Sequence, residues 1–264
     1  MVDITPAAGE APHRVELPTC RIGYVNPLDI IDTCPYEFYR LAPDNAIASM
    51  ISIGLSGFSG DAARQAVDSN LTRCLAQLAK RRVDFVVLGG LPMLYNLGPD
   101  YSAEFRERCR TEFGLRGGTS IDAVNAAFRA LGAQRVVMTN KWDDQLNARV
   151  ADSLASAGVN LVGTVAQAHT ADQVKSSFEQ GVDVALRLVE RALRQHPDAD
   201  CVFIAGGAWL VAPLVADIER EFGVAVVAGQ QAKIWYSLNM VGNHVDRPAY
   251  GRLMTTPAQP SHLA

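Results

Sequence analysis

The sequence lacks the features that would indicate binding to nucleic acids or insertion into a membrane. Acidic residues outnumber basic ones, 28 to 24, and the pI is near 5.7, so the chain has none of the cationic excess typical of nucleic-acid-binding proteins. No apolar run approaches the ~20 residues that a membrane-spanning helix needs. The stretch "MVDITPAAGEAPHRVELPT" has neither a cationic start nor an apolar segment, so it does not resemble a secretory signal. We therefore expect neither nucleic acid nor membrane among the partners.

The cysteines show no spacing that would predict a metal centre or a disulfide framework. Five are scattered along the chain, at Cys20, Cys34, Cys74, Cys109 and Cys201, without a C-x-x-C pair and without histidines at zinc-ligand spacing. This pattern predicts a reduced, cytoplasmic protein that holds no metal.

The chain does contain a regular alternation of strand and helix patterns. Short apolar runs bounded by glycine or proline occur at Arg21–Pro27, Asp84–Gly90, Arg135–Asn140, Asp200–Gly207 and Gly223–Gly229. Amphipathic segments occur at Asp61–Arg81, Ser120–Leu131, Asp144–Ala157 and Ala171–Gln195. Continuous apolar strands alternating with helices predict an α/β fold whose parallel strands are buried on both faces.

An internal repeat indicates two similar halves. "RIGYVNP", "DFVVLGG" and "EFGLRGGTS" are followed in the same order, roughly 110 residues later, by "RVVMTNK", "DCVFIAGG" and "EFGVAVVAGQQ". We therefore expect two pseudo-symmetric Rossmann-like lobes, 21–125 and 126–240, with an active-site cleft between them. Residues 1–20 are expected to be a flexible lead-in, and residues 241–264 a C-terminal segment that can cross back to the first lobe.

Four strand ends are expected to converge on this cleft, because ligands of open α/β sheets bind outside the carboxyl ends of the strands. They are Asn26-Pro27, Gly89-Gly90, Asn140-Lys141 and Gly206-Gly207. The glycine pairs carry no side chains, so their backbone N–H groups can approach an anionic oxygen. A tight strand-to-helix turn is the alternative interpretation of each pair.

Several segments together resemble the aspartate/glutamate racemase superfamily, and within it the branch of maleate cis-trans isomerase and arylmalonate decarboxylase. The similar segments are "RIGYVNP", "DFVVLGG", "ALGAQRVVMTN", "NARVADSLASAGV", "DADCVFIAGGAWLVAPLVADIEREFGVAVVAGQQAKIW" and "RPAYGRLM". They cover most of the chain, from about Arg21 to Met254. In this family the chemistry usually depends on a cysteine at the end of one or both symmetry-related strands. The resemblance places Gly89 and Gly206 at those two positions, so both cysteines are missing.

The resemblance also suggests which residues contact a substrate. A Thr-Ser pair of the decarboxylase, which helps to bind a carboxylate, corresponds to Gly90 and Leu91. Lys141 stands where the decarboxylase has a tyrosine that contacts the substrate, and a lysine partly removed from water there can act as an acid or a base, form a Schiff base or hold a carboxylate. The alternative is a surface lysine that opens a helix capped by Asp143 or Asp144.

Other candidates have polar side chains near the expected cleft. Gln230 and Gln231 can orient a carboxylate, Asn26 follows the first strand, and Ser120 opens a helix, although an N-terminal cap at Thr119-Ser120 explains the last pair equally well. Lys233 can add a cation or point outward, and Tyr95 can supply a phenol or cover the core. His169 follows what looks like an edge strand, Cys34 is more easily read as structural, and Cys201 as a core residue.

Together with these observations, the resemblance implies an enzyme that works without metal or organic cofactor on a small carboxylated substrate, with a homo-oligomer possible. The favoured reaction is that of a decarboxylase-like lyase passing through an enolate-type intermediate, with Lys141 as the catalytic residue. An isomerase or racemase of the maleate type, a lysine-assisted hydrolase, and a binding protein that has lost turnover are the alternatives.

Overall fold

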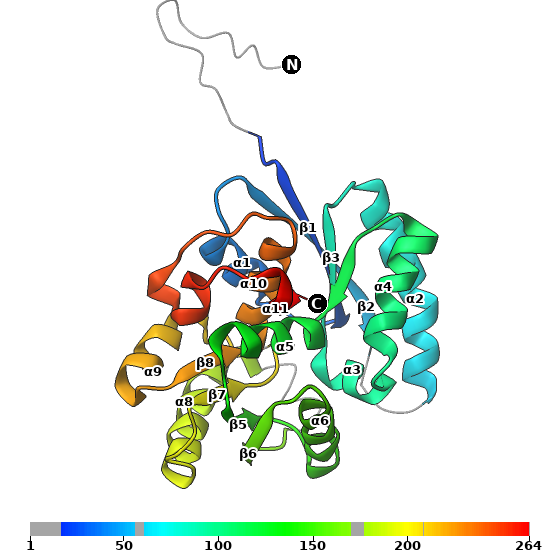
Figure 1. Cartoon of the computed structure of the whole chain (residues 1–264). Coiled ribbons are helices and arrows are strands. Elements are labelled where there is room, and N and C mark those ends of the chain that lie inside the picture. The colour runs from blue at the N-terminus through cyan, green and yellow to red at the C-terminus, as the bar shows by residue number, and fades with distance from the viewer. Residues whose placement is uncertain (1–16, 56–60, 170–176, 208, 264) are drawn as a thin grey trace, which may run out of the picture.

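Two four-stranded parallel sheets form the framework of the protein (Figure 1). The computed structural model describes residues 17–55, 61–169, 177–207 and 209–263. The first sheet has the order β2-β1-β3-β4, with β1 Cys20–Leu28, β2 Ala46–Leu55, β3 Phe85–Leu88 and β4 Gly117–Thr119. The second has the order β6-β5-β7-β8, with β5 Arg135–Asn140, β6 Asn160–Ala166, β7 Cys201–Ile204 and β8 Ala225–Ala228.

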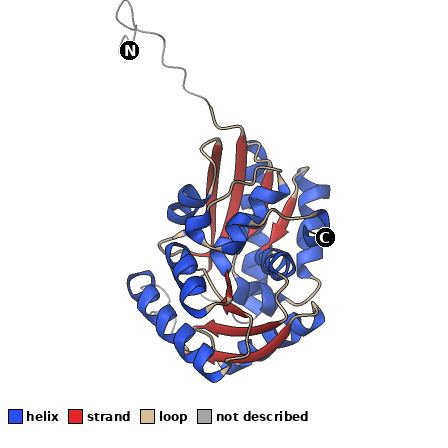
Figure 2. Ribbon diagram, turned by 60° about the vertical axis from the view of Figure 1, so that its left-hand side comes forward, coloured by secondary structure: helices blue, strands red, loops and turns tan. Residues whose placement is uncertain are grey.

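Helices lie on both sides of the sheets (Figure 2). In the first half they are α1 Cys34–Leu41, α2 Asp61–Lys80, α3 Leu91–Leu97, α4 Tyr101–Phe113 and α5 Ser120–Leu131. In the second half they are α6 Asp144–Ser156, α8 Ser177–Gln195, α9 Val215–Phe222, α10 Gly229–Met240 and α11 Pro260–Leu263, with short 3₁₀ turns η1 Ala212–Leu214, η2 Pro248–Tyr250 and η3 Arg252–Thr255. In the part of the chain that is described, no helix is both long and apolar enough to cross a bilayer.

The α/β class predicted from sequence is confirmed, and so is the repeat of strands. The three repeated segments form β1, β3 and β4 in one sheet and β5, β7 and β8 in the other, at the same places in the strand order. The edge strand β2 was not predicted. The expected helix at Ala171–Gln195 is described from Ser177 onward, and its earlier part lies outside the described residues.

Alternate residues of the central strands face different hydrophobic cores. Phe85 and Val87 of β3 belong to a core shared by both halves, whereas Val86 and Leu88 belong to a core under α2 and α4. In the same way β7 faces the shared core and a third core that belongs to the second sheet. Each central strand is therefore covered on both faces, as a parallel sheet requires.

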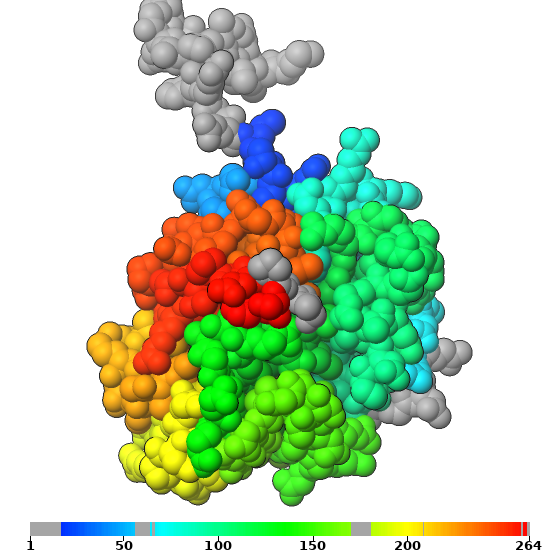
Figure 3. All heavy atoms as spheres, in the orientation of Figure 1, coloured from blue at the N-terminus to red at the C-terminus, as the bar shows by residue number. Residues whose placement is uncertain are grey.

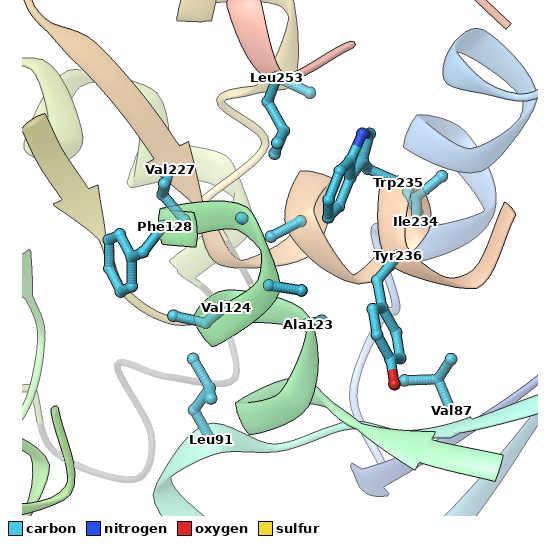
Figure 4. Close-up of a cluster of buried hydrophobic side chains, with 14 of the residues drawn as sticks. Val87, Leu91, Ala123, Val124, Phe128, Val227, Ile234, Trp235, Tyr236 and Leu253 are labelled. Atoms are coloured by element: carbon cyan, nitrogen blue, oxygen red, sulfur yellow. The ribbon is translucent and has the colours of Figure 1, made fainter. Parts of the chain in front are cut away.

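Helices α5 and α10 pack against each other in the shared core (Figure 4). The start of α5 is fixed by Thr119, whose hydroxyl accepts from the Asp122 N–H while the Asp122 carboxylate accepts from the Thr119 N–H. Helix α10 follows the last strand of the second sheet, yet it also contacts β3 and α1 of the first half. It therefore brings side chains from the second half to the strand ends of the first.

The C-terminal segment lies over residues of both halves and is seen in red beside the green α5 in Figure 3. Arg247 donates to the Ala42 carbonyl, and the Arg252 N–H donates to the buried carboxylate of Glu219. The division of the chain at 125/126, which falls inside α5, remains a proposal.

Candidate functional site

The two sheets end in equivalent turns, which define where a site can form. Val25 pairs with Leu88 in the first sheet, and Thr139 pairs with Ile204 in the second. The next residue in each case, Gly89 or Ala205, donates its N–H to the last paired residue of the neighbouring strand, at 2.8 and 2.9 Å. Gly89 is therefore equivalent to Ala205.

By this register Gly90 in the first half is structurally equivalent to Gly206 in the second. The expectation that Gly89 is equivalent to Gly206 was therefore wrong by one residue. Gly90 and Gly206 have positive φ, +93° and +105°, a region that side-chain-bearing residues rarely adopt. By the same register Asn26, after Val25, is equivalent to Asn140, after Thr139.

The two equivalent glycines have different surroundings. A Cβ on Gly90 would lie 2.5 Å from Pro27 Cγ, so the Pro27 ring fills the space that a side chain would need. A Cβ on Gly206 would lie 3.2 Å from the Nε1 atom of Trp209 and 3.8 Å from Trp142. Indole rings therefore border the Gly206 turn and exclude water from one side of it.

Lys141 directly follows β5 and is buried, with 8% of its surface exposed. Its ammonium group lies 4.0 Å from the centre of the Trp209 ring, a cation–π distance. Loss of hydration lowers the pKa of Lys141 from 10.5 to about 8. The alternative of a solvated surface lysine is excluded, although Asp143 does cap α6 by accepting from the Leu146 N–H.

The strand ends of the two halves meet through the first turn of α10. A Cβ on Gly229 would lie 3.0 Å from the Gly206 carbonyl oxygen and 3.5 Å from Leu91 Cδ1, so Gly206 and Leu91 border the same point. Gln230 Oε1 lies 3.3 Å from the Cβ position of Gly207. The Gly207 carbonyl in turn accepts from the Thr33 hydroxyl at 3.1 Å.

Some candidate residues are engaged in holding the framework. The Asn140 side chain donates to Asn147 Oδ1 at 2.8 Å and accepts from the Trp142 N–H at 2.9 Å, which fixes the turn into α6. The Ser120 hydroxyl donates to the Leu88 carbonyl. Gln231 donates to the Tyr250 carbonyl and so fastens the C-terminal segment.

Tyr95 and His169 occupy different environments. Tyr95 is buried in the shared core, and burial raises the pKa of its phenol. The N–H of His169 donates to the Lys141 carbonyl at 3.0 Å. Desolvation and the nearby charge of Lys141 lower the pKa of His169. His169 lies next to Lys141 at the end of β6, which is an edge strand as expected.

Comparison with known proteins decides the family. Residues 31–254 match the family model described as "Arylmalonate decarboxylase". The chain belongs to the arylmalonate decarboxylase family. It is 30% identical over 222 residues to arylmalonate decarboxylase of Bordetella bronchiseptica, covering 83% of this chain and 90% of that protein.

Solved structures of this family and of maleate isomerases have the same fold. A liganded arylmalonate decarboxylase variant with one glycine changed to cysteine and one cysteine to serine superposes with a TM-score of 0.75 at 28% identity, covering 89% of this chain and 98% of that one. Maleate isomerase of Pseudomonas putida with maleate gives a TM-score of 0.79 at 19% identity, covering 90% and 98%.

This member of the arylmalonate decarboxylase family also has buried charges that sequence patterns did not place. Lys233 is 4% exposed, and its ammonium group donates to Asn26 Oδ1 at 3.2 Å and lies 5.1 Å from the centre of the Tyr24 ring. It also lies 3.5 Å from the Cβ position of Gly89. The Asn26 amide donates to the carboxylate of Asp32, so Asn26 is held between a cation and an anion.

Two further titratable groups, Cys34 and Glu37, lie on α1 and are fully buried. Burial raises the pKa of Cys34 to about 12, although the charge of Lys233 acts in the other direction. The spacing of Asp32, Cys34 and Glu37 around a short helix is the only sequence signal for this cluster. From the sequence alone, a glutamate on a buried helix cannot be distinguished from a glutamate on an exposed helix.

Proposed function

We propose that the protein is a decarboxylase-like lyase that acts on a small malonate-type carboxylate and uses Lys141 where its relatives use a thiol. The observation that carries this proposal is the burial of Lys141 at a strand end against Trp209, with its pKa near 8. A lysine with such a pKa is mostly protonated at pH 7 and is still a sufficiently strong acid to give up its proton.

The proposed reaction requires no group beyond the chain and water. The substrate carboxylate that remains binds the Lys141 ammonium, while the one that leaves lies against the apolar Trp142 and Trp209 rings. Loss of CO₂ breaks the bond from the α-carbon, and its electron pair becomes an enediolate on the remaining carboxylate. Lys141 stabilises that charge and delivers a proton to the α-carbon, and solvent water returns the proton to Lys141.

We also propose that Gly90 and Gly206 occupy the positions of the family cysteines. The register of the two sheets supports this assignment, because it makes these two glycines equivalent. A solved arylmalonate decarboxylase variant that carries one glycine-to-cysteine and one cysteine-to-serine exchange has the same fold as this chain. Neither glycine can donate a proton, so the acid must come from elsewhere in the site.

The decisive experiment measures CO₂ release and incorporation of solvent deuterium with aryl- and alkenylmalonates. Lys141→Met should lower kcat/KM by about 10²-fold or more, the lower range for the loss of a general acid. Lys80→Met, at an exposed position, is the matched control. In the wild-type protein kcat/KM should fall above pH 8 as the ammonium deprotonates.

Each other outcome has a defined meaning. Near-wild-type activity of Lys141→Met would contradict the proposal. Thermal stabilisation by malonates without turnover would indicate a binding protein, and interconversion of maleate and fumarate would indicate an isomerase. Trapping of Lys141 by borohydride with a keto acid would indicate Schiff-base chemistry instead of acid catalysis.

A further inference from the structure

Glu37 on α1 is a buried carboxylate that links the two halves next to the site. It is 1% exposed, and its Oε1 atom accepts from the Ala212 N–H at 3.1 Å. Ala212 opens η1 in the second half, a few residues after the Gly206-Gly207 turn. Among the described residues, the other carboxylate oxygen of Glu37 has no hydrogen-bond partner. A buried carboxylate in this situation is costly, so its place calls for a functional reason.

Three residues before Ala212 stands Trp209, the aromatic neighbour of Lys141. The Trp209 indole N–H donates to the Ala205 carbonyl at 2.7 Å, and its ring lies against the Lys141 ammonium. Leu210, the next residue, has φ +54°, which is unfavourable for a side chain by roughly 1–2 kcal/mol. A strained residue of this kind persists only where neighbouring contacts fix the chain on both sides.

Two of the contacts that fix this segment come from the first half. The Thr33 hydroxyl, one residue before α1, holds the Gly207 carbonyl, and Glu37 holds the Ala212 N–H. Trp209 and the strained Leu210 lie between these two anchors. Helix α1 itself contacts β2 of the first half and α10 of the second, so the two anchors tie the segment around Trp209 to a helix that lies between the halves.

We infer that Glu37 is a positioning residue that, from the first half, holds Trp209 against Lys141 and so keeps Lys141 poorly hydrated. The inference rests on the proposed function only in that it concerns the same lysine. Its test reads the titration of Lys141 and not turnover, so either can fail without the other.

In the part of the chain that the structure describes, three charged or titratable groups face Glu37. Lys233 approaches from α10 and favours the ionised carboxylate, while Asp32, before α1, opposes it, and Cys34 lies on the same helix. Desolvation outweighs these effects and raises the pKa of Glu37 to about 7. Ionisation strengthens its hydrogen bond with Ala212, because a carboxylate is a better acceptor than a carboxylic acid. The anchor should therefore tighten as the pH rises through 7.

The test is an NMR titration of protein labelled at lysine Cε. The chain has four lysines, Lys80, Lys141, Lys175 and Lys233, so the Lys141 signal can be assigned by its loss in Lys141→Met. In Glu37→Ala the Lys141 pKa should rise by about 1 unit, because a displaced Trp209 lets water reach the ammonium. Glu37→Gln keeps an oxygen acceptor and should leave the Lys141 pKa near 8. Glu104→Gln, at an exposed site on α4, is the control.

A second variant allows the inference to be tested if Glu37→Ala does not fold. Thr33→Val removes the other anchor and should raise the Lys141 pKa in the same direction. In addition, the chemical shift of the Trp209 indole N–H in the wild-type protein should change with pH in two steps, one with a midpoint near pH 7 from Glu37 and one near pH 8 from Lys141. In Glu37→Gln the step near pH 7 should be absent and the step near pH 8 should remain. An unchanged Lys141 pKa in Glu37→Ala or Thr33→Val, or a step near pH 7 that survives in Glu37→Gln, would overturn the inference.

Discussion

Gly90 and Gly206 occupy the same place in two copies of one structural unit, yet Pro27 fills the space beside the first while indole rings border the second. The ladders that pair Val25 with Leu88 and Thr139 with Ile204 set this equivalence. The pseudo-symmetry therefore holds for the backbone but not for the side chains around it. Any chemistry at this centre is asymmetric, and Gly206 lies in the same half as Lys141.

This asymmetry predicts different outcomes when a thiol is introduced at each glycine. Gly206→Cys should fold, with a loss of stability of about 1–2 kcal/mol for its positive φ, because its Cβ would be 3.2 Å from Trp209 Nε1, a contact relieved by a shift of a few tenths of an ångström. Gly90→Cys should lose more, because Pro27 Cγ would lie 2.5 Å from its Cβ. Denaturant unfolding of both variants measures the difference.

Activity of the same variants tests the proposed position of the family cysteines. Gly206→Cys should bring thiol chemistry to the site, so that malonate decarboxylation in this variant becomes sensitive to iodoacetamide. A Gly206→Ser variant is the control for the added bulk. Equal stability of the two cysteine variants would contradict the difference in packing around the two glycines. A Gly206→Cys enzyme whose activity does not change on alkylation would contradict the proposed position of the family cysteine.

The strands were predictable where apolar, β-branched residues are continuous. β3, β7 and β8 are buried on both faces, and each is a short apolar run followed within two residues by a glycine. β2, "AIASMISIGL", mixes alanine, serine and glycine with larger residues, and half of it is only partly buried at a sheet edge. It becomes a strand because β1 offers a long parallel partner, which is a tertiary effect that local pattern does not contain.

The site was predictable to the extent that strand ends determine it. Lys141 follows a strand directly, so its place in the fold is determined by the strand itself. Lys233 could not be placed in the same way, because α10 is buried on every side from Gly229 to Leu238 and has no polar face that would indicate its orientation. Glu37 depends on the packing of α1 against the other half, which no local spacing specifies.

Alkylation of the native protein should leave it active. All five cysteines are buried, and burial raises the pKa of Cys34 and of Cys109 to about 12, so almost no thiolate is present at pH 8. Iodoacetamide should therefore label the native protein slowly and the denatured protein at five positions, as mass spectrometry can count. Rapid labelling of Cys34 with a parallel loss of turnover would indicate that the Cys34 thiol takes part in the reaction and would contradict the proposed mechanism.

Removing the Lys141 charge should stabilise the fold at neutral pH. The pKa of Lys141 is lower in the folded protein, about 8, than the usual 10.5, so between these values the unfolded chain binds the proton more tightly. Burial of the ammonium thus destabilises the native state below pH 8, and this penalty disappears as the pH rises from 8 to 10.5. Lys141→Met also loses the cation–π contact with Trp209, worth about 1 kcal/mol.

The net expectation for Lys141→Met at pH 7 is a gain of about 2 kcal/mol in the free energy of unfolding, since a shift of one pKa unit corresponds to about 1.4 kcal/mol. Denaturant unfolding at pH 7 and at pH 10 should show the gain shrinking or changing sign at the higher pH, while Lys80→Met shows no such dependence. A variant that gains stability as it loses activity is the behaviour of a residue kept for function at the expense of the fold. A loss of stability at pH 7 would mean that the folded protein compensates the charge, and Lys141 would then be a structural cation.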